Sequence, residues 1–277
     1  MDKQNTIKDP VSVSGIALHT GARAGLKILP AEENTGITFR RVDLPGKPEV
    51  KALAQNVVDV RRGTTIASGD ASVVTVEHVM AALHAAQIDN AIVEMDGFEP
   101  PILDGSALPY CTMVKEAGKV EQNAPARYIV PKEPAYVEYK GTKTIILPCD
   151  RFIIDCVTSF GDSPLDTQYR EQEITEQSFI EEIAPARTFV SYRDLAQLLA
   201  MGLVKGGSLD NAIIIHDGAM ICKEELRFEN ELARHKILDI VGDMYLTGCR
   251  VKGHVIAIKP GHPTNVQLAG AILKQYI

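Results

Sequence analysis

The stretch Arg234-His235-Lys236-Ile237-Leu238-Asp239-Ile240-Val241-Gly242-Asp243 combines a helical hydrophobic pattern with three polar side chains at four-residue spacing. At 3.6 residues per turn, positions i, i+4 and i+8 drift by only about 40° per step, so His235, Asp239 and Asp243 share one helix face. An imidazole and a carboxylate one turn apart can chelate a divalent cation such as zinc. The same spacing also occurs where a His–Asp pair is only structural.

Composition and charge limit the classes of function. The chain has 277 residues, of which 45% are hydrophobic and 23% charged, and its formal net charge is −7. Such a chain forms one large or two ordinary soluble domains. The acidic balance and the lack of long Lys/Arg runs argue against nucleic-acid binding. The start MDKQNTIKDP is unlike a secretory signal, and no apolar run approaches the ~18 residues of a membrane span, so we expect no transmembrane segment.

The cysteines indicate a reducing compartment. Their number is odd, they are scattered, and none forms a CxxC motif, which argues against a disulfide framework and against a thiolate zinc site. The five positions are Cys111, Cys149, Cys156, Cys222 and Cys249. We therefore expect a cytoplasmic protein, and we expect it to be a monomer.

The order of predicted elements occurs twice. Short strands, marked by Ile28-Leu29-Pro30 in one half and Ile146-Leu147-Pro148 in the other, are followed by a helix, a strand and a second helix. These elements are predicted at 76–87, 91–96 and 109–118, and again at 230–246, 253–261 and 264–275. We predict an α+β fold of two domains with duplicated topology, each a sheet packed on two helices.

The predicted domains are residues 1–120, with a small β insert, and residues 128–277, with 119–127 reading as a linker. The equivalent strands at 28 and 146 are 118 residues apart, whereas His78 and His235 are 157 apart. The second half therefore carries about 39 extra residues, and the segment around 186–216 resembles a β-α-β-like insert. An insertion of this size in a compact domain is usually functional.

The repeat strengthens the metal hypothesis. His78 and His235 occupy equivalent places near the starts of equivalent helices. If the two domains pack face to face, both imidazoles reach one cation together with Asp239, and a fourth position stays open for water. Glu77 then lies beside the metal, where a carboxylate can act as general base, although an acidic residue in a first helical turn is also favoured by the helix dipole.

A second pair of residues is a candidate for the proton donor. Asp243 lies one turn beyond Asp239 and can hold a histidine by its ring N–H, and the best partner is His262 in the loop 259–265. An Asp-paired imidazole tends to be protonated and can donate a proton to a leaving amine. By contrast, His84 points to another helix face than His78 and is predicted to be structural.

Seven motifs occur in series along the chain. They are GIALHTG (15–21), TVEHVMAALHA (75–85), ILDGSA (102–107), ARTF (186–189), GGSLDNAI (206–213), LRFENELARHKILDIVGD (226–243) and KPGHPTN (259–265). Together they closely resemble the family of UDP-3-O-acyl-N-acetylglucosamine deacetylases, the zinc amidases of lipid A biosynthesis. The resemblance covers nearly the whole chain and implies two α+β domains, each with an insert, around one active site.

The resemblance also implies roles for single residues. It implies one Zn²⁺ ion, or Fe²⁺ on the same ligands, bound by His78, His235 and Asp239. Glu77 would be the general base, His262 the acid oriented by Asp243, and Thr188 a hydroxyl donor to the oxyanion. The residues that would contact the sugar, the nucleotide or the reacting centre are Phe189, Lys236, His19, Phe160 and Lys259.

The substrate implied is a UDP-linked acylated glucosamine. The second insert would supply an apolar passage for the acyl chain, formed by Leu195, Leu198, Leu199, Leu203 and Val204. By pattern alone the same segment is equally an amphipathic helix packed on a sheet. A hydrolase of another amide and a non-catalytic nucleotide-sugar or lipid-binding protein are the alternative functions.

Overall fold

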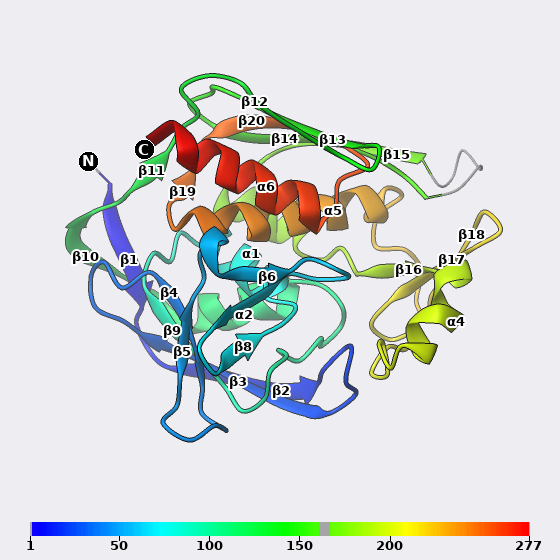
Figure 1. Cartoon of the computed structure of the whole chain (residues 1–277), viewed down its shortest axis with the longest axis horizontal. Coiled ribbons are helices and arrows are strands. Elements are labelled where there is room, and N and C mark those ends of the chain that lie inside the picture. Colours follow the sequence, from blue (N-terminus) through cyan, green and yellow to red (C-terminus); the bar gives the residue numbers. More distant parts are fainter. Residues whose placement is uncertain (1, 161–166, 277) are drawn as a thin grey trace.

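Each half of the chain builds a five-stranded sheet, and the helices of both halves lie between the two sheets (Figure 1). This computed structural model describes residues 2–160 and 167–276. From bottom to top in Figure 1 the layers are the first sheet, the helices of the first half, the helices of the second half and the second sheet. The predicted α+β fold class is confirmed.

The first sheet has the strand order β2-β3-β9-β4-β5, in which only β9 and β4 are parallel neighbours. Its helices are α1 (Glu77–Ala85) and α2 (Leu108–Ala117). Burial alternates along β9 because one face of the sheet packs on the helices. The strands are β2 (Val11–Ile16), β3 (Arg23–Pro30), β4 (Ile37–Arg41), β5 (Glu49–Lys51) and β9 (Ala91–Met95).

The second sheet repeats this arrangement in the order β12-β13-β20-β14-β15, again with one parallel pair, β20 and β14. Its helices are α5 (Glu231–Met244) and α6 (His262–Leu273). The strands are β12 (Ala135–Tyr139), β13 (Thr142–Leu147), β14 (Phe152–Ser159), β15 (Thr167–Glu173) and β20 (Gly253–Ile258). The two sheets thus share strand order and strand directions.

Each half also carries an insert, which in the sequence lies between the strands of its sheet and its first long helix. The first insert is a small antiparallel sheet, and the second combines three strands with a helix that projects from the body of the molecule (Figure 1). The first contains β6 (Val57–Asp59), β7 (Thr65–Ser68) and β8 (Ala71–Val73). The second contains β16 (Phe189–Ser191), α4 (Tyr192–Ala200), β17 (Ile213–His216) and β18 (Ala219–Ile221).

The predicted linker is wrong in one respect. Lys119–Pro125 forms strand β10, which pairs antiparallel with β1 (Lys3–Ile7). Most side chains of β10 are exposed, so its sequence lacks the apolar alternation that marks a strand. A further two-stranded sheet follows the predicted linker, in which β11 (Tyr128–Ile129) pairs parallel with β19 (Arg250–Val251). The domain limits at 1–120 and 128–277 stay a prediction.

The remaining helical segments are short. They are Ala54–Asn56, α3 (Glu176–Ser178), Phe179–Ile183, Tyr245–Thr247 and Lys274–Tyr276. Among the residues that the structure describes, no helix has the length and apolar character needed to cross a bilayer.

The centre of the molecule is the contact between α1 and α5. Every residue of α1 is buried, and so is every residue of α5 except Lys236. Gly242 of α5 faces the backbone of α1 so closely that a Cβ atom there would lie 2.1 Å from the carbonyl oxygen of Glu77. The absence of a side chain at this position therefore sets the distance between the two helices.

We expect Gly242→Ala to lower the free energy of unfolding by about 1–3 kcal/mol, because the added methyl group must push two packed helix backbones apart. Gly270→Ala in α6 is the matched control, since a Cβ atom there meets nothing within 4 Å. Alanine is favoured over glycine inside a helix by roughly 0.5–1 kcal/mol, so this control should be neutral or stabilising. Denaturant unfolding of both variants checks the contrast, and equal effects would contradict the packing argument.

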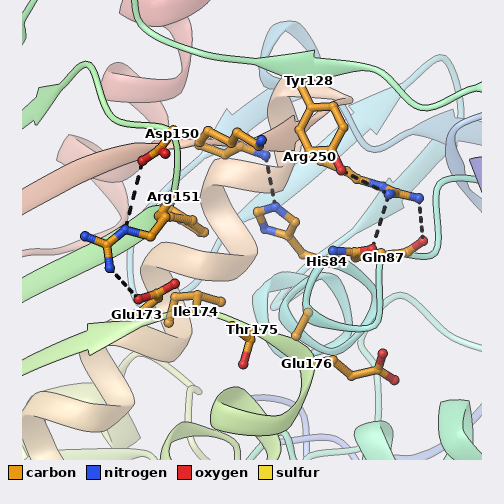
Figure 2. A pocket seen from close by; sticks show the side chains of 14 residues that line it. His84, Gln87, Tyr128, Asp150, Arg151, Glu173, Ile174, Thr175, Glu176 and Arg250 are labelled. Carbon is orange, nitrogen blue, oxygen red and sulfur yellow. Dashed lines mark hydrogen bonds and ion pairs between the residues drawn. The ribbon is translucent and has the colours of Figure 1, made fainter. Parts of the chain in front are cut away.

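His84 joins the two halves on the other side of α1. Its Nδ1 lies 2.8 Å from the carbonyl oxygen of Val241, its Nε2 accepts from the backbone N–H of Val251 at 3.4 Å, and its ring stacks on Tyr245 at 4.3 Å. Figure 2 shows His84 at the wall of a cavity that it shares with Arg250. Burial lowers the pKa of His84 to about 4, which fits a neutral, structural imidazole.

This burial predicts a pH dependence of stability. The pKa of His84 falls from 6.5 to about 4 on folding, so between these pH values the unfolded chain binds a proton that the folded chain excludes. Stability is therefore fully present above pH ~6.5 and decreases as the pH falls, by up to about 3 kcal/mol. His84→Gln should flatten this dependence, whereas His216→Gln, at an exposed histidine, should not. Equal slopes for wild type and His84→Gln in pH-dependent unfolding would contradict this role.

Candidate active site

His78, His235 and Asp239 meet where α1 and α5 touch. Their candidate ligand atoms all lie within 4.8 Å of one another, and all three residues are buried. The two imidazole rings stand edge to face, with centroids 5.2 Å apart. Each histidine lies in the first turns of its helix, so the packing of α1 on α5 brings the rings together.

The chemistry of these three groups fits a divalent metal ion. His235 Nδ1 donates to the carbonyl oxygen of Ala186 at 3.0 Å, which leaves the lone pair of Nε2 free. The Nδ1 atom of His78 is buried and has no hydrogen-bond partner among the described residues. Burial lowers the pKa of His78 to about 3 and also lowers that of His235, so both rings are neutral, the form that binds metals.

Asp239 supplies the negative charge of the group. Burial alone would raise the pKa of its carboxyl group, but the Lys236 ammonium and the charged His262 ring lower it, so the group is ionised. The Nζ atom of Lys236 lies 2.8 Å from Asp239 Oδ2. Two neutral imidazoles and one carboxylate are a donor set typical of catalytic zinc, which leaves a coordination position open.

A buried ion pair holds the segment that orients His235. Arg187 Nε donates to Glu231 Oε1 at 2.8 Å, and the exposed fractions of the two side chains are 2% and 0%. Glu231 also accepts from the backbone N–H groups of Arg187 and Arg227 at 3.0 and 2.8 Å. This pair fixes the residue next to Ala186, whose carbonyl group sets the tautomer of the His235 ring.

Glu77 lies beside the three candidate ligands. Its Oε2 accepts from the backbone N–H of Thr64 at 3.0 Å, and its Oε1 lies 3.7 Å from His262 Nε2. Burial raises the pKa of Glu77 to about 7, although the charge of His262 opposes this shift. A carboxylate with this pKa can take up a proton near neutral pH.

His262 and Asp243 form a buried pair next to Glu77 and Asp239. His262 Nδ1 lies 2.9 Å from Asp243 Oδ2, and the same oxygen accepts from Asn265 Nδ2 at 2.9 Å. Burial alone would lower the pKa of His262, but Asp243, Glu77 and Asp239 raise it to about 9. The imidazole is therefore a cation that can donate a proton from Nε2.

These groups open into a cavity of about 270 Å³ between the two halves. Thr188 and Phe189 enter it from the second insert, and Phe160 packs on Phe189 with ring centroids 4.6 Å apart. The Lys236 ammonium lies 5.1 Å from the centre of the Phe189 ring. The predicted site residues that line the cavity are Glu77, His78, Phe160, Thr188, Phe189, His235, Lys236, Asp239 and His262.

Four of the predicted substrate contacts lie outside this lining, as do the other residues of the predicted acyl passage, Leu195, Leu199 and Leu203. His19 donates its backbone N–H to Glu99 at 3.0 Å, and its Nε2 lies 3.2 Å from a carbonyl oxygen of the first insert. Lys259 is exposed, Leu198 is a buried residue of α4 itself, and Val204 follows that helix with a positive φ of 51°. The structure does not bring these four side chains to the cavity, and their roles stay predictions.

Several contributors were missed from the sequence. Asn265 could have been found, because it follows His262 by three residues and so shares its helix face. Arg62 of the first insert pairs with Asp194 of the second at 3.0 Å, and both line the cavity. Thr64 contacts Asp243, which is 179 residues away in the sequence, and no local sequence pattern predicts such a contact.

Comparison with known proteins gives the same family along the whole chain. The family model described as LpxC, UDP-3-O-acyl N-acetylglycosamine deacetylase, matches residues 4–274. A relative from Citrifermentans bemidjiense named UDP-3-O-acyl-N-acetylglucosamine deacetylase is 44% identical over 98% of this chain and 89% of its own length. One of the same name from Chlamydia felis is 42% identical over 98% and 97%. A bifunctional enzyme LpxC/FabZ from Porphyromonas gingivalis is 40% identical over 99% of this chain and 65% of its own length. The chain therefore belongs to the UDP-3-O-acyl N-acetylglycosamine deacetylase family.

Proposed function

We propose that this protein hydrolyses the N-acetyl group of UDP-3-O-acyl-N-acetylglucosamine, with release of acetate and UDP-3-O-acyl-glucosamine, as a step of lipid A biosynthesis. Membership of the family makes the chain a hydrolase that acts on an amide. One observation carries the proposal for this chain: a single cavity holds a three-donor metal group together with a carboxylate and a protonated imidazole. Metal-assisted amide hydrolysis uses these three components, to polarise the carbonyl group, to activate water and to protonate the leaving amine.

The metal is proposed to be one Zn²⁺ ion, and Fe²⁺ would fit the same donors. His78, His235 and Asp239 would hold it, because their donor atoms converge and two of them are neutral imidazoles. What such an ion supplies is Lewis acidity toward the amide carbonyl group and a lowered pKa of nearby water. Proton transfer and substrate binding would be carried out by the side chains around it.

Two side chains would move the protons. Glu77 takes a proton from the attacking water on Oε1, since its other oxygen is held by a backbone N–H. His262 carries a proton on Nε2, 3.7 Å from that oxygen, and donates it to the nitrogen of the departing glucosamine. Asp243 accepts the hydrogen bond of the His262 Nδ1–H group, so the Nε2 proton is the one that can be donated to the substrate.

Other cavity residues would bind the substrate. The Thr188 hydroxyl group, in the cavity lining, would stabilise the negative charge that develops on the amide oxygen, an effect that lowers the barrier most when the donor is fixed beforehand. Lys236 offers a cation to an anionic nucleotide sugar despite the net charge of −7. Phe160 and Phe189 offer ring faces to the sugar.

The proposal also covers where the protein acts. All five cysteines are free thiols in the structure, which supports the cytoplasm as its compartment. We further propose that it acts as a monomer, since both halves of the cavity come from one chain.

Replacement of the proposed base gives the first functional test. Glu77→Gln keeps the shape of the side chain but removes the proton acceptor, so turnover should fall by about 10²–10⁴-fold. Metal content should stay at the wild-type level, because Glu77 is not among the three donors. Glu116→Gln, at an exposed position of α2, is the matched control and should keep wild-type rates. Acetate release from UDP-3-O-acyl-N-acetylglucosamine is the measurement, and near-normal rates in Glu77→Gln would remove Glu77 from the mechanism.

Removal of a proposed ligand should act on the metal itself. Asp239→Ala and His78→Ala each delete one donor, so metal content should fall from about one ion per chain and deacetylation should fall with it. Elemental analysis and acetate release, before and after chelation, follow both quantities. Bound metal without acetate release would point to another amide substrate, and wild-type protein purified without any metal would favour the structural interpretation of the His–Asp group.

A further inference from the structure

Thr64 lies between the two groups that would move protons. It precedes β7 in the first insert and is completely buried. Its hydroxyl oxygen lies 2.6 Å from Asp243 Oδ1 and 3.3 Å from His262 Nδ1. Its backbone N–H donates to Glu77 Oε2 at 3.0 Å. One residue of the first half thus contacts the proposed base and both members of the proposed acid pair.

The hydrogen bonds of Asp243 show what the Thr64 side chain does. Oδ2 accepts from His262 Nδ1 and from Asn265 Nδ2, both at 2.9 Å. Among the described residues, the Thr64 hydroxyl group is the hydrogen-bond donor to Oδ1. A carboxylate can only accept, so the hydroxyl group must donate to it. Without this bond, one oxygen of a carboxylate that is 1% exposed would have no partner.

This bond fixes the rotation of the carboxylate. An Asp side chain held at one oxygen alone can turn about its Cβ–Cγ bond, whereas bonds on both oxygens define the carboxylate plane. The plane determines where Oδ2 lies and hence how the His262 ring is tilted. Because His262 Nε2 is 3.7 Å from Glu77 Oε1 and 4.0 Å from Asp239 Oδ2, a small tilt changes its distance to both groups.

We propose that Thr64 is a positioning residue of the reaction, whose hydroxyl group holds the Asp243 carboxylate so that His262 Nε2 points to the reacting centre. The inference rests on the proposed function. It assigns a role to the first insert, because this small sheet carries a hydrogen bond to a helix of the other half. The Thr64 backbone contact to Glu77 does not depend on the side chain, so substitutions at Thr64 report on the acid pair.

Two substitutions separate the hydroxyl group from the methyl group. Thr64→Val keeps the shape and removes the hydrogen bond, and we expect kcat to fall by about 10–100-fold with little change in KM or metal content. Thr64→Ser keeps the hydroxyl group and should retain kcat close to that of wild type. Thr65→Val, at the next residue, is the matched control, because among the described residues it is the Thr64 side chain, and not that of Thr65, that bonds the acid pair.

A double-mutant cycle tests whether Thr64 acts through Asp243. In an Asp243→Ala background, Thr64→Val should cause no further loss, because the carboxylate that it orients is gone. Losses that multiply would show an independent effect and overturn the proposal. So would a Thr64→Val enzyme with wild-type kcat, or a Thr64→Ser enzyme as slow as Thr64→Val. If Thr64→Val does not fold, Thr64→Ala compared with Thr64→Ser isolates the same hydroxyl group.

A measurement without substrate keeps this inference separate from the proposed function. In histidine-labelled, metal-loaded protein, the Nδ1–H signal of His262 should shift and exchange faster with water in Thr64→Val, and should stay near the wild-type position in Thr64→Ser. An unchanged signal in Thr64→Val would refute the positioning role. If wild-type protein failed to release acetate, the proposed function would fall, while this comparison would still decide whether Thr64 orients the ring.

Discussion

The contact between α1 and α5 is the constraint on which the rest of the structure depends. Gly242 lets the two helix backbones approach, because a Cβ atom at this position would collide with the carbonyl oxygen of Glu77. At this distance the first turns of the helices bring His78 and His235 to one point. The sheets and the surface strands act on the site by keeping these two helices in place, whereas the inserts also contribute side chains to it.

Burial gives the assembled groups their chemistry. A carboxylate in water is ionised at neutral pH and a poor proton acceptor, but the enclosed Glu77 has a pKa of about 7. The same burial keeps His78 neutral, whereas three carboxylates around His262 keep that ring charged despite its burial. The three histidines have the same intrinsic pKa, yet two are neutral and one is charged within a few ångströms. The carboxylates Glu77 and Asp239 likewise have pKa values that are shifted in opposite directions.

Much of this arrangement could be predicted from the sequence. The helical period placed His235, Asp239 and Asp243 on one face, and the internal repeat paired His235 with His78, because both signals are local or are repeated along the chain. Strand β10 escaped prediction, since a strand with two mostly exposed faces has no hydrophobic alternation. Thr64 was missed for a different reason: it bonds a carboxylate 179 residues away in the sequence, and the residues around it give no sign of this contact.

The division of the metal donors between the two halves has a thermodynamic consequence. One donor belongs to α1 and two belong to α5, so neither half could assemble the three-donor group alone. An ion that binds this group would bind the docked halves in preference to the separated ones, and mass action would then favour the folded chain. Linkage is reciprocal, so whatever loosens the packing of the halves also weakens the affinity for the ion. For such a protein, retaining its metal and retaining its fold are two descriptions of one equilibrium.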